Sequence, residues 1–90
     1  MHKQSKVWVV DDDSSIRWVL ERALSQAGID NESFADGDQL LQRISGEQPD
    51  VIISDIRMPG IDGLELLSHI NSAHPDLPVI ITTAHSDLDS

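Results

Sequence analysis

The sequence alternates short runs of β-branched apolar residues with longer segments in which apolar residues recur at helical spacing. The apolar runs occupy residues 7–10, 51–53 and 79–81, and each lies next to Asp or Pro. Such runs predict strands that are buried on both faces of a parallel sheet. Residues 31–34 leave room for a weaker strand, and their polar composition predicts an edge position.

Three helical patterns separate these runs. In the first, apolar residues from Ile16 to Ala27 follow the i, i+3, i+4, i+7, i+8, i+11 rule, and Gly28 then supplies a stop. The second stripe consists of Leu40, Leu41 and Ile44, and the third of Leu64, Leu67 and Ile70. These three stripes predict amphipathic helices that pack against the sheet.

Polar residues before the second and third stripes predict where those helices begin. Asp36 or Asp38 is a suitable N-cap for the second helix. Asp62 and Glu65 have the spacing of a capping box at the start of the third. The predicted order is therefore β-α-β-α-β-α-β, and the fold class is α/β with a doubly wound parallel sheet and right-handed crossovers.

Composition narrows the class of protein. A chain of 90 residues suffices for one small domain. The absence of cysteine excludes disulfides and thiolate metal sites, and it suits a cytoplasmic location. No apolar run approaches the ~20 residues of a membrane helix, so no membrane association is expected. A formal charge of −10 repels nucleic acid, so this segment is not expected to bind it directly.

Acids and hydroxyls follow the predicted strands at the edge where parallel sheets bind ligands. The first strand is followed by Asp11, Asp12 and Asp13, the third by Ser54 and Asp55, and the fourth by Thr82 and Thr83. Clustered carboxylates need protons or a cation, and Mg²⁺ suits hard oxygen ligands with open water positions. A carboxylate beside that ion can attack phosphorus and form an aspartyl phosphate.

Each of these features also has a purely structural explanation. The acidic run can act only as an N-cap that favours the helix dipole. Thr82 and Thr83 can be ordinary β-branched strand residues. A phosphoryl site is favoured because three separate strand ends carry the groups that one such site requires.

The sequences Val-Val-Asp-Asp-Asp before the first helix, Ser-Asp-Ile-Arg-Met-Pro-Gly around Asp55 and Ile-Ile-Thr-Thr-Ala after Pro78 resemble response regulator receiver domains. Residues 7–24 and 83–89 look like the nitrogen regulatory protein C group of sigma-54-dependent transcription activators. The resemblance implies a flavodoxin-like, CheY-like receiver fold and a role in two-component phosphorelay signalling, within nitrogen regulation. It also implies a phosphoprotein in which a sensor histidine kinase supplies the phosphoryl group.

The resemblance implies roles for individual residues. Asp55 matches the phosphoacceptor, and Asp11 and Asp12 match the acidic pair that binds Mg²⁺. Asp13 is an additional acid and a possible ligand, and Arg57 matches the position whose backbone carbonyl completes the metal site. Thr83 matches the switch hydroxyl that contacts the phosphate. The receiver catalyses only its own phosphorylation, so it is not an enzyme with turnover.

The sequence also departs from the receiver family in one respect. Receivers continue through a further helix, a fifth strand ending in a lysine and a last helix, whereas the only lysines here are Lys3 and Lys6. Residues 5–90 are therefore expected to form a partial receiver, with the first three β-α units and the fourth strand. An unpaired fourth strand invites pairing with another chain, so dimerisation or domain swapping is expected. Without the lysine, weaker coupling between phosphorylation and any switch is expected.

A haloacid-dehalogenase-like phosphatase is the alternative from another class. Those enzymes also place Asp-x-Asp after an apolar strand, with Asp11 as the nucleophile and Asp13 as the acid/base. The alternative leaves the sequence around Asp55 unexplained. Identifying the aspartate that carries the phosphoryl group separates the two hypotheses.

Overall fold

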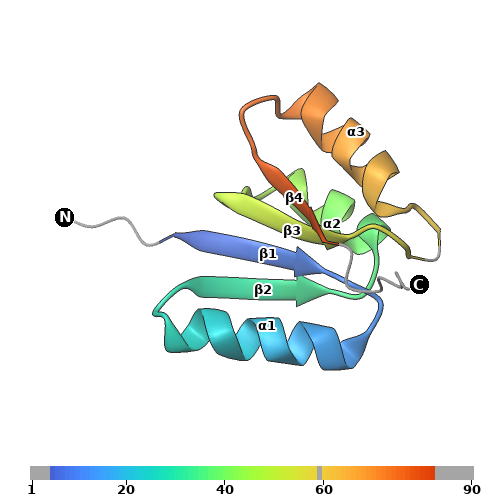
Figure 1. Ribbon diagram of the computed structural model, residues 1–90. Coiled ribbons are helices and arrows are strands. Elements are labelled where there is room, and N and C mark those ends of the chain that lie inside the picture. Colours follow the sequence, from blue (N-terminus) through green and yellow to red (C-terminus); the bar gives the residue numbers. More distant parts are fainter. Residues whose placement is uncertain (1–4, 59, 83–90) are drawn as a thin grey trace.

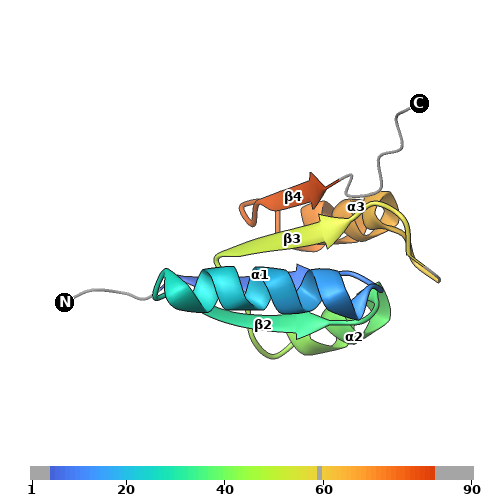
Figure 2. The same ribbon diagram turned by 60° about the horizontal axis from the view of Figure 1, so that its bottom comes forward.

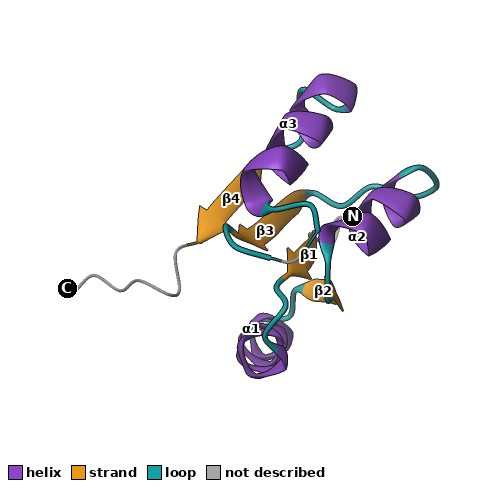
Figure 3. Cartoon of the chain, turned by 90° about the vertical axis from the view of Figure 1, so that its right-hand side faces the viewer, coloured by secondary structure: helices purple, strands orange, loops and turns teal. Residues whose placement is uncertain are grey.

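The computed structural model describes residues 5–58 and 60–82. The described elements, in chain order, are β1 (Lys6–Val10), α1 (Ser14–Gln26), β2 (Asp30–Phe34), α2 (Gly37–Ile44), β3 (Val51–Asp55), α3 (Gly63–Ala73) and β4 (Val79–Thr82). The four strands form one parallel sheet in the order β2-β1-β3-β4 (Figure 1). Helix α1 lies on one face, and α2 and α3 lie on the other (Figure 3). The predicted doubly wound α/β architecture is confirmed.

The strands occupy the predicted segments, but β4 is less covered than predicted. The polar strand β2 lies at an edge of the sheet, as its composition indicated. Strand β4 forms the other edge among the described residues, and the side chain of Ile80 is 52% exposed. The expectation that β4 is buried on both faces is therefore wrong, because among the described helices α3 packs against β4 on one face and α1 packs against β1 and β2 instead.

Helix α1 begins and ends where the sequence predicted. Asp13 is its N-cap, and Gly28, with φ of 78°, follows its C-cap in the left-handed conformation that glycine adopts readily. The helix runs along β2 and β1 (Figure 2). Its apolar face is only partly covered by the described residues, because no residue of α1 is fully buried and Val19 is 56% exposed. No described helix is both long and apolar enough to cross a membrane.

The core lies between the sheet and the helices α2 and α3. Trp8 is fully buried at its centre, and the ring centroid of Phe34 lies 5.2 Å away in an edge-to-face arrangement. The remaining buried apolar residues of this cluster are Val10, Leu40, Ile44, Ile52, Met58, Leu66, Ile70 and Leu77. The core therefore packs against the two central strands, β1 and β3.

The buried face of α3 differs from the predicted stripe. Gly63, Leu66 and Ile70 are buried, whereas Leu64 is 56% exposed. The spacing of the leucines is compatible with either face, and the contact of Gly63 with the end of β3 selects the observed one. The capping box between Asp62 and Glu65 is confirmed.

Candidate functional site

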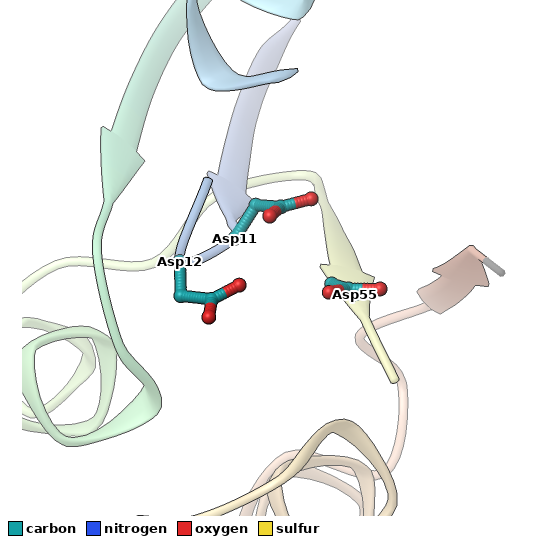
Figure 4. A group of neighbouring side chains, drawn as sticks. All are labelled: Asp11, Asp12 and Asp55. Atoms are coloured by element: carbon teal, nitrogen blue, oxygen red, sulfur yellow. The ribbon is translucent and has the colours of Figure 1, made fainter. Parts of the chain in front are cut away.

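The register of the central strands brings two acids to the same level of the sheet. Val10 of β1 is paired with Ser54 of β3. Asp11 directly follows β1, and Asp55 is the last residue of β3, so both side chains emerge at the carboxyl edge (Figure 4). The ligand-binding edge of a parallel sheet is thus occupied by carboxylates.

Three carboxylates gather at this edge. One oxygen from each of Asp11, Asp12 and Asp55 lies within 4.8 Å of the others. Asp11 and Asp55 are 2% and 1% exposed, whereas Asp12 is exposed. Burial raises the pKa of the Asp11 carboxyl, and the nearby charges of Asp55, Asp12 and Asp13 raise it further. The backbone N–H of Asp13, which donates to Asp11, acts in the opposite direction.

Backbone hydrogen bonds orient the two buried acids. The N–H of Asp11 donates to the carbonyl of Phe34 at 3.1 Å, and the N–H of Asp13 donates to Asp11 Oδ1 at 2.9 Å. On the other strand, the N–H of Ile56 donates to Asp55 Oδ1 at 2.9 Å. These contacts fix the backbone at Asp11 and direct one oxygen of each carboxylate toward a neighbouring backbone N–H.

A surface cleft opens beside the three acids. Its volume is about 630 Å³, and Asp12, Asp13, Ser14 and Arg57 line it. The side chain of Arg57 is exposed, so the cleft combines acids with a nearby cation. The cleft therefore gives solvent access to the exposed Asp12 carboxylate of the acidic group.

The donor set fits Mg²⁺. Three hard carboxylate oxygens lie together on one side, and the exposed position of Asp12 leaves the other side accessible to water. Mg²⁺ is usually bound by a few carboxylates while it keeps several waters. Asp11, Asp12 and Asp55 are therefore a group of side chains that could hold such an ion.

Two further candidate residues, Asp13 and Thr82, make hydrogen bonds to the backbone. The carboxylate of Asp13 accepts hydrogen bonds from the N–H groups of Ser15 and Ile16, so it caps α1. Thr83 lies outside the described residues. The hydroxyl of Thr82 donates to the carbonyl of Ser54 at 3.4 Å.

Sequence reasoning missed Arg17 beside the site, and it named Ser54 without predicting its contact. The guanidinium of Arg17 donates to the carbonyl of Asp11, and the buried hydroxyl of Ser54 donates to the carbonyl of Asp55. Arg17 lies one turn into α1, and this position close to the acidic run was the only hint in the sequence that its side chain could reach the site. Which carbonyl its side chain reaches depends on how α1 leaves the strand, and no sequence pattern gives that angle.

The family model described as the response regulator receiver domain matches residues 7–90. The chain belongs to the response regulator receiver family. Together with the parallel sheet and the acidic group, this match confirms the resemblance of the sequence, and it gives no support to the phosphatase alternative.

This receiver is similar in sequence to curated proteins from two groups of regulators. It is 63% identical over 84 residues to the DNA-binding transcriptional regulator NtrC of Escherichia coli K12, with 93% of this chain covered. It is 40% identical over 88 residues to the C4-dicarboxylate transport regulator DctD of Rhizobium meliloti. The match covers 18% of the length of the former relative and 19% of the latter.

Solved structures agree with the fold of this receiver. The beryllofluoride-activated NtrC receiver domain has a TM-score of 0.80 at 60% identity, with 98% of this chain and 71% of that chain covered. TrrA from Thermotoga maritima, in complex with Mg²⁺ and beryllofluoride, has a TM-score of 0.87 at 34% identity, with 94% and 77% covered. The receiver therefore shares its architecture with proteins that were solved with beryllofluoride.

Proposed function

We propose that this receiver accepts a phosphoryl group on Asp55 from a phosphohistidine of a sensor histidine kinase. The observation that carries the proposal is the convergence of Asp11, Asp12 and Asp55, with ligand atoms within 4.8 Å of one another. In the transfer, a carboxylate oxygen of Asp55 forms the new P–O bond. The P–N bond to the histidine breaks, and the imidazole leaves with the electron pair.

Asp11, Asp12, Asp55 and the backbone carbonyl of Arg57 hold Mg²⁺ in this proposal, with Asp13 as a further possible ligand. When bound, the ion neutralises charge on the phosphoryl oxygens. The residues of the chain supply the positioning: burial and the N–H of Ile56 direct Asp55, and the cleft beside Asp12 admits the donor. Thr83 contacts the phosphoryl group and begins the switch.

Labelling with acetyl phosphate tests the acceptor. We expect Mg²⁺-dependent incorporation into the wild type, loss of incorporation in Asp55→Asn, and no change in Asp76→Asn. Asp76 is an exposed acid in the turn before β4, so its variant controls for the loss of one charge. Borohydride reduction followed by mass spectrometry identifies the modified residue. Modification of Asp11 would instead support the phosphatase chemistry.

The longer protein is proposed to be a sigma-54-dependent transcription activator of nitrogen regulation, with residues 5–90 as part of its receiver. Identity of 63% to NtrC of Escherichia coli K12 supports this. A chimera that carries this segment in that NtrC should activate a nitrogen-regulated promoter when its kinase is present. The same chimera with Asp55→Asn should stay inactive, and equal activity of the two would contradict the proposal.

Self-association is a further proposal for the 90-residue chain. Ile80 on the edge strand β4 is 52% exposed, and unpaired edges attract other strands. We expect sedimentation to show dimers or larger species, and Ile80→Lys to shift them toward monomer. Leu64→Lys, at a residue of similar exposure on α3, should leave association unchanged. A monomeric wild type with a cooperative melt would contradict the proposal.

A further inference from the structure

Arg17 makes a contact that the proposed phosphoryl chemistry does not use. It lies in the first half of α1, and its side chain is partly buried. Its Nη1 donates to the backbone carbonyl of Asp11 at 2.6 Å. A charged donor of this kind makes a stronger hydrogen bond than a neutral one.

The position of that carbonyl gives the contact its importance. The carbonyl of Asp11 belongs to the peptide that joins Asp11 to Asp12, one residue beyond the end of β1. The adjacent backbone is tied by the N–H of Asp11 to Phe34 and by the N–H of Asp13 to the carboxylate of Asp11. Arg17 therefore holds the peptide plane that lies between these two ties.

The orientation of this peptide determines where the Asp12 side chain leaves the backbone. Asp11 and Asp55 are buried and held by the core, whereas Asp12 is exposed and lies on the turn before α1. Of the three carboxylates, Asp12 thus depends most on the turn for its direction. The N-terminus of α1 is tied to the same turn by the cap at Asp13 and by the N–H of Arg17, which donates to the carbonyl of Asp13 at 3.1 Å.

We propose that Arg17 is a positioning residue for the cation site, which holds the Asp11–Asp12 peptide so that the Asp12 carboxylate faces Asp11 and Asp55. The inference rests on the proposed function, in which these three residues bind Mg²⁺. Arg17 contacts neither the ion nor the phosphoryl donor in this proposal.

A role in positioning and a role as a nearby charge predict opposite effects. A guanidinium beside an acidic cluster repels a divalent cation, so its removal should strengthen Mg²⁺ binding if charge alone matters. If Arg17 positions Asp12, its removal should weaken binding, because one ligand then samples other directions. Loss of a residue that orients a metal ligand costs about 10- to 100-fold in metal affinity.

The experiment compares Arg17→Met with Arg22→Met in Mg²⁺ titrations of the purified chain, followed by amide NMR shifts. Arg22 is the other arginine of α1, and its guanidinium lies 5.2 Å from the Trp18 ring centroid, away from the acids. We expect about tenfold weaker affinity in Arg17→Met and no weakening in Arg22→Met. We also expect the Asp12 and Asp13 amides of metal-free Arg17→Met to shift, which a charge effect on the ion cannot produce.

Arg17→Lys keeps the charge and can donate one hydrogen bond, so we expect an affinity between those of wild type and Arg17→Met. Urea unfolding identifies any variant that does not fold. If Arg17→Met does not fold, the affinity of Arg17→Lys is compared with that of wild type instead. Affinity equal to or above that of wild type in the folded Arg17 variants would overturn the inference alone. Absence of Mg²⁺ binding by the wild type would instead overturn the proposed function.

Discussion

Gly63, the first residue of α3, lies directly against the backbone of Asp55. A Cβ at position 63 would be 2.3 Å from the carbonyl oxygen of Asp55 and 2.8 Å from the Cα of Ile56. The N–H of Gly63 donates to the carbonyl of Ile56 at 3.0 Å. The helix can approach the end of β3 this closely only because the residue has no side chain.

Gly63→Ala should therefore destabilise the fold and disturb the site together. Because the clash is with backbone atoms, either the helix or the end of β3 must shift. Overpacking of this kind costs about 1–3 kcal/mol in the free energy of unfolding. Urea unfolding measures this cost, and the rate of labelling by acetyl phosphate should fall because Asp55 moves with the strand end.

Gly46→Ala is the matched control for this substitution. A Cβ at position 46 would meet only the carbonyl of Arg43, at 4.0 Å, and the backbone of Gly46 does not have a positive φ. We expect unchanged labelling and a stability equal to or up to about 1 kcal/mol above that of wild type. Equal effects of the two substitutions would contradict the close contact at Gly63.

Two leucines of α3 should respond very differently to truncation. Leu66 is fully buried, so Leu66→Ala should lower the free energy of unfolding by about 2–5 kcal/mol. Leu64 is 56% exposed, so Leu64→Ala should change it by no more than about 0.5 kcal/mol. Urea unfolding of both variants measures these changes. A larger loss of unfolding free energy in Leu64→Ala than in Leu66→Ala would show that α3 buries the face that the sequence predicted.

The sequence predicts the elements of this fold well and their coverage less well. β-Branched runs indicate β1, β3 and β4, and capping residues indicate where the helices begin, because those signals are local. The exposure of Ile80, Val19 and Leu64 depends instead on which elements lie beside them. Apolar spacing alone does not carry that information, so the predicted buried faces of β4, α1 and α3 needed correction.

The candidate site follows a similar division. The convergence of Asp11 and Asp55 was predictable, because parallel strands in neighbouring positions end at one edge. The contacts of Arg17 with Asp11 and of Gly63 with Asp55 were not. Both depend on the angle at which a helix meets the sheet, which packing of the whole domain determines.

The start of α2 offers a test between two candidate caps. The carboxylate of Asp36 accepts a hydrogen bond from the N–H of Gln39 at 2.9 Å, whereas Asp38 lies within the first turn. Asp36→Ala should therefore lower the free energy of unfolding by about 1 kcal/mol. Asp38→Ala loses only a favourable interaction with the helix dipole and should cost less. Thermal or urea unfolding checks both, and the reverse order would show that Asp38 is the cap.

An ion pair between Lys6 and Glu47 should make stability depend on pH at both ends of the range. The hydrogen bond to Glu47 raises the pKa of Lys6, and the hydrogen bond to Lys6 lowers the pKa of Glu47. The contribution from Glu47 is complete above its unfolded pKa of about 4.3 and is lost as pH falls through the folded value. The contribution from Lys6 is complete below its unfolded pKa of about 10.4 and is lost as pH rises through its folded pKa.

Lys6→Met tests this dependence. The substitution removes the ion pair but keeps the backbone N–H that donates to Asp50. The stability of Lys6→Met should therefore fall below that of wild type between these limits and converge with it outside them. The difference should be small and should decrease at high salt, because the pair is partly exposed. A difference that is constant across the pH range would mean that Lys6 stabilises the chain through its hydrocarbon stem instead.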